Sequence, residues 1–284
     1  MLAYRHAFHA GNHADVLKHL VLDRVLRYMT EKDKPFTLVD THAGAGGYSI
    51  EGRYAQKNGE FSHGISRLYD RKDLPAPLQG YVDLVKQFNP DGQLRQYPGS
   101  PAIANMLMRE TDRLRVYELH PTDHRILESY LAGRPNTQVS DKDGFASLKS
   151  ELPPPSRRGA VLMDPPYEIK TDYAKVLAAL REGLQRFPDC VFMIWYPQLQ
   201  LLEATQLAQR LKASADTAAK KGWLHVRLTV QQPDEKGFGM LGSGMFVANP
   251  PFTLHDELAA CLPYLVERMG QYEGANFVLE QRAV

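Results

Sequence analysis

Phe36–Gly47 (FTLVDTHAGAGG) is the stretch that decides the fold of this 284-residue chain. A short apolar run typical of a buried strand ends at Asp40, and a turn of small residues rich in glycine follows it directly. Such a turn lets the backbone approach a ligand closely before the next element begins. Its glycines stand at positions 44, 46 and 47, which is not the strict GxGxxG spacing that binds phosphates. The turn therefore fits a ligand without phosphate, and equally a purely structural turn.

Apolar strands and helical patterns alternate through the rest of the chain. Strands are predicted at 114–118, 137–139, 159–164, 190–195, 224–230 and 245–249, and helices at 15–33, 172–186 and 199–214. This alternation is typical of a doubly wound, mostly parallel α/β sheet whose ligands bind at the carboxyl ends of the strands. We therefore expect a Rossmann-like fold with seven strands. The last two should pair as a hairpin, because no helix fits between them.

One spacing departs from an ordinary nucleotide-binding unit. The acid that ends the second strand usually lies ~20 residues beyond the glycine turn, but Glu118 stands 71 positions after Gly47. Roughly 50 residues are therefore inserted, by comparison with that usual spacing. We expect residues 1–48 and 98–284 to form the Rossmann-like domain, with residues 1–20 as a flap over the ligand. Residues 49–97 should form an inserted helical subdomain above the ligand-binding end of the sheet.

Composition excludes several classes of protein. The net charge is only +1, so any surface that binds nucleic acid must be local. Cys190 and Cys261 stand among apolar residues, which favours two buried thiols over a disulfide. No cluster of cysteines and histidines suggests zinc, and we predict no metal. The N-terminus lacks a secretory segment, and no apolar run reaches the ~20 residues that cross a bilayer. A cytoplasmic monomer is expected.

Acidic residues end successive predicted strands. Asp40 and Glu118 end two of them, and Asp143 follows a third. An acid after the second strand can accept hydrogen bonds from both hydroxyls of a ribose. Asp143 can accept the amino group of an adenine, and Gly144 would let that ring lie against the backbone. Together with Gly44 in the glycine turn, these positions indicate a site for S-adenosylmethionine. Each acid alone also fits an ordinary strand end or turn.

The tetrapeptide Asp164–Tyr167 (DPPY) follows an apolar strand and indicates the chemistry. The exocyclic amino nitrogen of a base is a poor nucleophile, because its lone pair is delocalised into the ring. Two acceptors, the Asp164 carboxylate and the Pro165 carbonyl, can bind its two N–H groups and localise that lone pair. The two prolines fix the backbone, and Tyr167 offers a flat face to a base that leaves its stack. Asp164 can also take up the released proton.

A second Pro-Pro site, Asn249–Phe252, has the same chemical layout. A Rossmann-like methyltransferase has its catalytic tetrapeptide after the fourth strand and needs three further strands. Asp164 leaves room for them, whereas Asn249 leaves only 35 residues. We therefore predict that Asp164 is the catalytic position. Asn249 is expected to end the last hairpin near the pocket for the target base.

Other polar residues are candidates on weaker grounds. His42 lies inside the glycine turn and should point at a cofactor bound there. Ser100 lies where the insertion rejoins the sheet, and it could equally cap a helix. The N-terminal segment combines Tyr4, Lys18 and His19, which suit contacts with cofactor or substrate and also a simple polar flap.

Three stretches resemble the RlmJ family of bacterial 23S ribosomal RNA adenine-N6 methyltransferases. They are Tyr4–His19 (YRHAFHAGNHADVLKH), Asp40–Gly46 (DTHAGAG) and Met163–Glu168 (MDPPYE). The N-terminal stretch is long and specific, whereas many methyltransferases of amino groups share the tetrapeptide. The resemblance covers essentially the whole chain, insertion included.

This resemblance implies a class I S-adenosylmethionine-dependent methyltransferase with an inserted helical subdomain. It implies cofactor contacts at His19, His42, Ser100, Glu118, Asp143, Gly144 and Asp164, with Asp164 as the catalytic acceptor. It also implies an N-terminal tail over the cofactor, with Tyr4, His6 and Lys18 suited to meet the RNA. The substrate would be 23S ribosomal RNA, free or in early assembly rather than in the mature ribosome.

Residue chemistry alone leaves other functions open. The tetrapeptide can bind any amino group, so methylation of guanine N2 or of adenine in DNA remains an alternative, and only the resemblance favours ribosomal RNA. A DNA-binding or DNA-uptake factor without catalysis would bind DNA whether or not S-adenosylmethionine is present. Its binding would also be unchanged by Asp164→Ala. A nicotinamide-dependent dehydrogenase is disfavoured, because the glycine spacing differs from the GxGxxG of dinucleotide-binding turns. The tetrapeptide would also have no function in hydride transfer.

Overall fold

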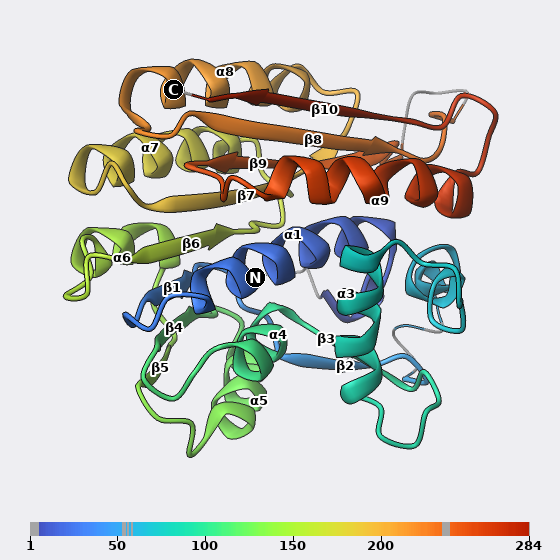
Figure 1. Cartoon of the computed structure of the whole chain (residues 1–284), viewed down its shortest axis with the longest axis horizontal. Helices are drawn as coiled ribbons and strands as arrows, with labels where there is room; N and C mark the ends of the chain where they lie inside the picture. The colour runs from blue at the N-terminus through green and yellow to red at the C-terminus, as the bar shows by residue number, and fades with distance from the viewer. Residues whose placement is uncertain (1–5, 53–54, 56, 58, 235–238, 284) are drawn as a thin grey trace.

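The structure is a computed structural model that describes residues 6–52, 55, 57, 59–234 and 239–283. In these residues eight strands form one sheet in the order β10-β8-β9-β7-β6-β1-β4-β5 (Figure 1). The strands of the sheet are β1 (Thr37–Asp40), β4 (Arg113–Tyr117), β5 (Thr137–Ser140), β6 (Gly159–Met163), β7 (Val191–Gln198), β8 (Trp223–Thr229), β9 (Gly242–Ala248) and β10 (Asn276–Arg282). Two short strands, β2 (Gly47–Ser49) and β3 (Gln96–Pro98), form a separate antiparallel ladder.

The sheet is mostly parallel, as predicted. The strands β5, β4, β1, β6 and β7 pair in parallel, and β9 lies antiparallel between β7 and β8. The predicted pairing of the last two expected strands is therefore confirmed. The predicted count of seven is wrong by one, because β10 pairs antiparallel with β8 at the edge. Most of its residues are exposed, so β10 lacks the apolar run that marks a buried strand.

Helices cover both faces of the sheet. They are α1 (His13–Thr30), α3 (Ala76–Gln87), α4 (Ser100–Leu107), α5 (Pro121–Leu131), α6 (Gly144–Glu151), α7 (Thr171–Arg186), α8 (Leu202–Ala218) and α9 (Leu254–Met269). One core joins α1, α3, α4, α5 and α9 to the sheet, and a second core joins α6, α7 and α8 to its other face. Within the described ranges, no helix is both long and apolar enough to cross a membrane.

Helix α1 is the central element of the first face and lies against α4, α9 and β9 (Figure 1). The Asn12 side chain caps it, because its Oδ1 accepts the N–H of Asp15 at 2.9 Å, a bond typical of helix starts. Almost the whole helix is buried, including Lys18 and His19. Polar side chains buried on a central helix need partners, and these are found at the site described below.

Residues 49–97 hold α3 together with the short helices η2 (Glu60–His63) and η3 (Ile65–Arg67). Helix α3 buries Leu78, Tyr81 and Val82 in the same core as α1. The two short helices adjoin the start of α1, where the N–H of Ile65 donates to the carbonyl of Gly11 at 2.8 Å. The insertion therefore shares a core with the main sheet and helps to fix the entry to α1.

Asn249 does not lie near the candidate site, contrary to the sequence prediction. It follows β9, whose last residue pairs with Phe192 at the start of β7. Its side-chain amide donates to the carbonyls of Pro188 and Cys190 at 2.8 and 2.7 Å. Because β9 runs antiparallel to β7, its end lies at the amino edge of the parallel strands. Asn249 is thus a buried structural residue.

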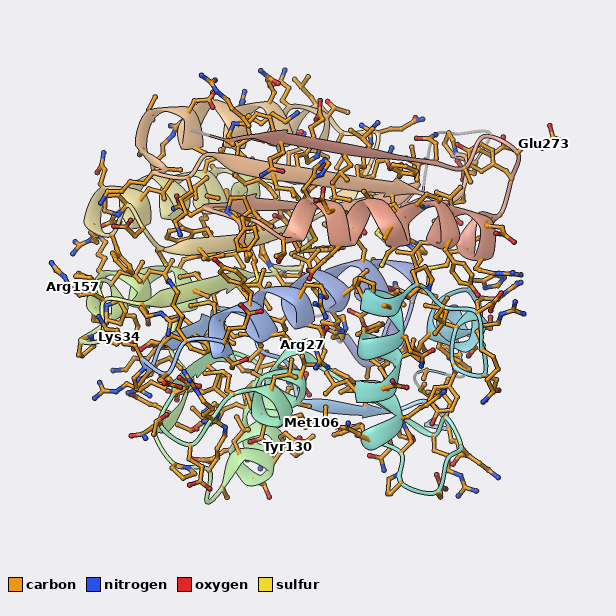
Figure 2. The ribbon with its side chains drawn as sticks, in the orientation of Figure 1. Arg27, Lys34, Met106, Tyr130, Arg157 and Glu273 are labelled. Atoms are coloured by element: carbon orange, nitrogen blue, oxygen red, sulfur yellow. The ribbon has the colours of Figure 1, made fainter. Side chains whose placement is uncertain are left out.

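The two edges of the parallel strands differ in their side chains. Lys34 and Arg157 are exposed at the amino ends of β1 and β6 (Figure 2). At the opposite edge, acidic residues end or follow β1, β4, β5 and β6. This acidic carboxyl edge is where doubly wound sheets bind ligands.

Candidate active site

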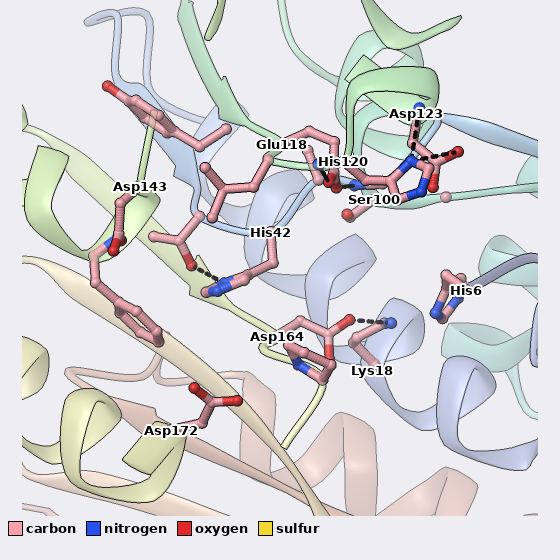
Figure 3. A pocket seen from close by; sticks show the side chains of 18 of the residues that line it. His6, Lys18, His42, Ser100, Glu118, His120, Asp123, Asp143, Asp164 and Asp172 are labelled. Carbon is pink, nitrogen blue, oxygen red and sulfur yellow. Dashed lines mark hydrogen bonds and ion pairs between the residues drawn. The ribbon is translucent and has the colours of Figure 1, made fainter. Parts of the chain in front are cut away.

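A cavity of about 180 Å³ opens at the carboxyl edge of the sheet (Figure 3). Its lining includes most residues predicted to bind the cofactor: His19, His42, Gly44, Ser100, Glu118, Asp143 and Asp164. They come from α1, the turn after β1, the start of α4 and the segments after β4, β5 and β6. The topology thus gathers side chains that are far apart in the sequence. We call this space the first cavity.

The Glu118 carboxylate ties the glycine turn to the loop after β4. Its Oε2 accepts the N–H of Gly44 at 2.8 Å, and its Oε1 accepts the N–H of His120 at 2.6 Å. Gly44 has a φ of +64°, and a Cβ there would lie 2.1 Å from the hydroxyl oxygen of Tyr48, so the turn requires glycine. Burial raises the pKa of Glu118, although both N–H groups oppose that shift. The acid predicted to bind a ribose therefore also shapes the turn.

Asp40 is buried behind the wall of the first cavity. Its Oδ2 accepts the hydroxyl of Ser100 at 2.6 Å, and its Oδ1 accepts the N–H of His42 at 3.3 Å. Burial raises the pKa of Asp40 to about 6. Burial also lowers the pKa of His42 to about 4, so that imidazole is neutral at physiological pH. Asp40 therefore holds the side chain of Ser100 and the backbone of His42 at the cavity wall.

Asp143 directly precedes α6 and caps it, because its Oδ1 accepts the N–H of Phe145 at 2.8 Å. Gly144 does not line the cavity. A Cβ at that position would lie 2.3 Å from the carbonyl oxygen of Thr41, so the glycine allows α6 to approach the turn after β1. The Phe145 ring lines the cavity instead and meets the His42 ring edge-on, with the centroids 4.7 Å apart. Gly144 thus has a packing role in this structure, and its predicted contact with an adenine ring stays a prediction.

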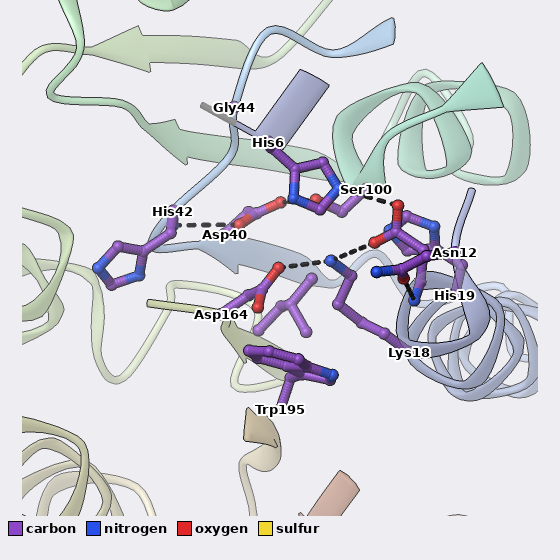
Figure 4. Close-up of polar contacts among 12 residues, drawn as sticks. His6, Asn12, Lys18, His19, Asp40, His42, Gly44, Ser100, Asp164 and Trp195 are labelled. Carbon is purple, nitrogen blue, oxygen red and sulfur yellow. Dashed lines mark hydrogen bonds and ion pairs between the residues drawn. The ribbon is translucent and has the colours of Figure 1, made fainter. Parts of the chain in front are cut away.

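Lys18 connects the candidate catalytic acid to the N-terminal segment (Figure 4). Its Nζ donates to Asp164 Oδ2 at 2.5 Å and lies 2.8 Å from Asp15 Oδ1. The Nε2 of His6 lies 2.9 Å from the other oxygen of Asp15. Only 4% of the Lys18 side chain is exposed. Lys18, predicted to meet the RNA, is therefore buried beside Asp164 and can meet a substrate only inside the site.

These ion pairs set the charges at the site. Burial favours the neutral form of Lys18, but Asp15 and Asp164 outweigh it and raise its pKa. Burial likewise opposes ionisation of Asp15, but His6 and Lys18 bring its pKa well below the ordinary value. For Asp164 burial prevails, and its pKa is raised although Lys18 opposes the shift. The site thus holds an ammonium between two carboxylates, of which Asp164 is the more easily protonated.

A second cavity, of about 450 Å³, adjoins the first. His6, Lys18, Asp164 and Pro166 line both. The remaining walls come from the N-terminal segment, from the insertion, and from β7 and the C-terminal region, in particular His9, His13, Glu60, His63, Trp195, Pro197, Leu199, Gln231, Met240 and Gln271. Asp164 therefore stands where the two cavities meet.

The expected stacking role of Tyr167 does not fit this geometry. Its ring is only 5% exposed, and it lines neither cavity. Its hydroxyl donates to the carbonyl of Trp195 at 2.7 Å, and its ring packs on that of Tyr173 with the centroids 4.6 Å apart. Its backbone has a φ of +52°, which turns the chain sharply after the two prolines. Pro165 is buried beneath the same turn.

The N-terminal segment lines the second cavity with histidines. His13 is 6% exposed, burial lowers its pKa to about 4, and its Nδ1 has no hydrogen-bond partner in the described part of the chain. His9 lies 2.9 Å from the Glu60 carboxylate, which raises its pKa. Tyr4, predicted to meet the RNA, lies outside the described residues. Among those described, no group of three or more His, Cys, Asp or Glu side chains is arranged to hold a metal ion.

Several lining residues were not predicted. His120 and Asp123 line the first cavity, and their place just after a strand-terminal acid could have revealed them. Trp195 was predicted only as a strand residue, and nothing local marks it as part of a cavity. Glu60 and His63 come from the insertion, whose fold the sequence did not specify in detail.

A doubly wound sheet with one reversed strand between β7 and β8, and with acids along its ligand-binding edge, defines a Rossmann-like class I methyltransferase fold. The chain belongs to the RlmJ family, because the family model described as "Ribosomal RNA large subunit methyltransferase D, RlmJ" matches residues 33–279. The family predicted from the sequence is therefore confirmed, and with it methylation of ribosomal RNA as the class of activity.

Relatives along the full chain agree. The chain is 46% identical over 269 residues to "Ribosomal RNA large subunit methyltransferase J" of Escherichia coli K12, covering 95% of this chain and 94% of that one. It is 43% identical over 270 residues to the protein of the same name from Haemophilus influenzae, again covering 95% and 94%. A crystal structure of a Legionella pneumophila protein is 32% identical, with a TM-score of 0.87, and covers 96% of this chain and 98% of that one.

Proposed function

We propose that this protein transfers a methyl group from S-adenosylmethionine to the N6 amino group of an adenine in 23S ribosomal RNA, in the cytoplasm. The observation that carries the proposal is the position of Asp164, which lines both cavities. A group shared by two adjoining cavities can face a cofactor on one side and a base on the other. Family membership supports ribosomal RNA as the substrate class.

The first cavity fits the cofactor in its chemistry. The Glu118 carboxylate and the Asp143 side chain can accept hydrogen bonds from hydroxyl and amino groups. Gly44, with its positive φ, brings the backbone of the turn to the wall of this cavity. Phe145 and Ile169 supply apolar surface for a ring. When bound there, S-adenosylmethionine supplies a methyl group whose bond to sulfur breaks as a bond to nitrogen forms.

Asp164 and Pro165 would activate the amino group of the base. The carboxylate accepts one N–H, and the carbonyl of Pro165 accepts the other, so the lone pair of the nitrogen turns towards the methyl group. The hydrogen bond from Lys18 to Asp164 in this structure indicates that a donor can reach the carboxylate. The amino nitrogen loses one proton during the transfer. Asp164 can accept it, because burial raises the pKa of that carboxylate.

The alternatives predict different outcomes. A guanine N2 or a DNA adenine offers the same two N–H groups, so the acceptor pair does not exclude either. A DNA-binding protein without catalysis would bind nucleic acid equally well after removal of the Asp164 carboxylate. The residue pattern at the junction of the two cavities favours catalysis over binding alone, because buried titratable side chains with raised pKa values gather at active sites.

The test is methyl transfer from radiolabelled S-adenosylmethionine to unmodified 23S ribosomal RNA, naked and within subunits. Asp164→Ala should lower the rate at least about 100-fold, the usual loss for one positioned electrostatic group, and leave cofactor affinity nearly unchanged. Asp164→Asn keeps an acceptor oxygen but loses the titrating group. The rate of this variant should therefore no longer fall at acidic pH as the wild-type rate does. Asp189→Ala, at an exposed ion pair with Lys220, is the control. A fully active Asp164→Ala enzyme would refute the mechanism.

A further inference from the structure

The second cavity needs an aromatic surface if it is to hold a base that has left its stack, and Tyr167 does not supply it in this structure. Proteins bind unstacked bases on aromatic side chains. The Tyr167 ring is enclosed by Tyr173 and by the backbone of Trp195. Trp195, in contrast, is partly exposed and lines the second cavity.

We propose that the Trp195 indole is the surface on which the target base stacks, and that Tyr167 positions it. The inference rests on the proposed function, since it assigns the base-binding wall of the same site. Figure 4 shows the Trp195 ring beside Asp164 and Lys18. A base on that ring would thus lie next to the carboxylate that accepts a hydrogen bond from its amino group.

The position of the Lys18 ammonium shows how far a donor to Asp164 lies from the Trp195 ring. Its nitrogen marks where a donor to Asp164 Oδ2 lies, and it is 5.9 Å from the centroid of the Trp195 ring. Stacked aromatic rings have their centroids about 4.5–7 Å apart. The Asp164 carboxylate and the indole are therefore close enough for one base in the second cavity to contact both. Pro166 and Pro197 give the cavity apolar walls near this ring.

Two observations describe the surroundings of the ring. The Tyr167 hydroxyl donates to the backbone carbonyl of Trp195, so the turn after the catalytic tetrapeptide is tied to this residue. The indole N–H is buried and has no acceptor within the described ranges. A buried donor without a partner is rare and calls for an explanation. The ring itself packs on that of Tyr167, with the centroids 6.0 Å apart, and it also lines the second cavity, where a ligand can contact it.

The test compares three variants in methyl transfer to unmodified 23S ribosomal RNA. Trp195→Leu removes the aromatic face and should lower kcat/KM about 5- to 150-fold, the range for one base-stacking contact. Trp195→Phe keeps a flat ring and should stay within about fivefold of the wild type. Trp223→Phe is the matched control, since Trp223 lines neither cavity. Affinity for S-adenosylhomocysteine should be unchanged in all three, which also reports folding.

Fluorescence gives a readout that does not depend on catalysis. The chain has two tryptophans, so Trp195 is the only one in the Trp223→Phe enzyme. Adenosine 5′-monophosphate, with S-adenosylhomocysteine present, should quench its emission saturably, whereas ribose 5-phosphate should not. Tyr167→Phe, which loses the bond to the Trp195 carbonyl, should weaken this quenching and spare cofactor affinity.

The two proposals fail in different ways. No quenching by the nucleotide, or a Trp195→Leu enzyme with wild-type kcat/KM, would overturn the role of Trp195. If nucleotide quenching is seen but the wild-type enzyme does not methylate RNA, the stacking surface stands and the proposed substrate is wrong.

Discussion

Replacement of Lys18 by methionine tests the electrostatics of the site most informatively. Methionine keeps the length of the side chain but removes the ammonium that lies between Asp15 and Asp164. Two buried carboxylates then lose their shared partner. Removal of one member of a buried ion pair usually costs about 3–5 kcal/mol. We expect Lys18→Met to lower the free energy of unfolding by about that amount.

The same change should shift the pH dependence of catalysis, and the structure gives a lower bound for the shift. Lys18 Nζ lies 2.5 Å from Asp164 Oδ2. Even with the dielectric constant of water, two unit charges at that separation attract by about 1.7 kcal/mol, which corresponds to about one pKa unit. Lys18 favours the ionised form of Asp164, so its removal raises the Asp164 pKa further. Because the proposed reaction needs the ionised Asp164, the acid limb of the rate profile should move to higher pH by at least about one unit.

The assay is single-turnover methyl transfer as a function of pH, together with denaturant unfolding of the same variant. Lys175→Met is the control, because Lys175 also lines the first cavity but is half exposed and pairs only distantly with Asp172, at 3.8 Å. The control should show neither effect. An acid limb that stays in place in Lys18→Met, or an unchanged free energy of unfolding, would refute the reasoning.

Two further predictions concern the first cavity. Glu118→Gln should raise the Kd for S-adenosylmethionine about 10- to 150-fold, because hydrogen bonds to a charged group contribute about 1.5–3 kcal/mol. Titration calorimetry measures this Kd, and Glu151→Gln, which changes the partner of the Tyr117 hydroxyl, is the control. Equal affinities of the Glu118→Gln variant and the wild type would contradict the role of Glu118. Asp40 has its pKa raised from 3.8 to about 6, so its contribution to stability is present below the unfolded pKa and is lost as pH rises through about 6. The loss is about 3 kcal/mol, and Asp40→Asn should abolish this part of the pH dependence of unfolding; parallel profiles for the two proteins would show that Asp40 is not the group responsible.

The strand ends could be predicted because each is marked locally. An apolar run followed by an acid is visible at Asp40, Glu118 and Asp164 without any tertiary information. Parallel topology then brings these ends to one edge, so residues of a common site follow from a secondary-structure prediction. Whether each acid faces the cavity could not be predicted. Asp40 is buried and does not line it, and its carboxylate accepts the hydroxyl of Ser100, which does.

The parts that were missed depend on packing between distant segments. Strand β10 has a mostly exposed, polar sequence, and only its pairing with β8 makes it a strand. The sequence identifies Lys18 only as a cation on a helix. Its contact with Asp164 could not be predicted, because that residue is 146 positions away in the sequence. Tyr167 was expected to face the substrate, yet contact with Tyr173 and the turn at φ +52° direct its ring into the protein. In each case a tertiary partner decides the position of a side chain that local patterns leave open.

Mass spectrometry of nucleosides from 23S ribosomal RNA that the purified enzyme has methylated tests the central proposal most directly. The RNA should come from cells that lack the enzyme, and S-adenosylmethionine should carry a deuterated methyl group. We predict labelled N6-methyladenosine with the wild-type enzyme and none with Asp164→Ala. Labelled N2-methylguanosine, or label that appears only in DNA, would contradict adenine-N6 methylation of ribosomal RNA.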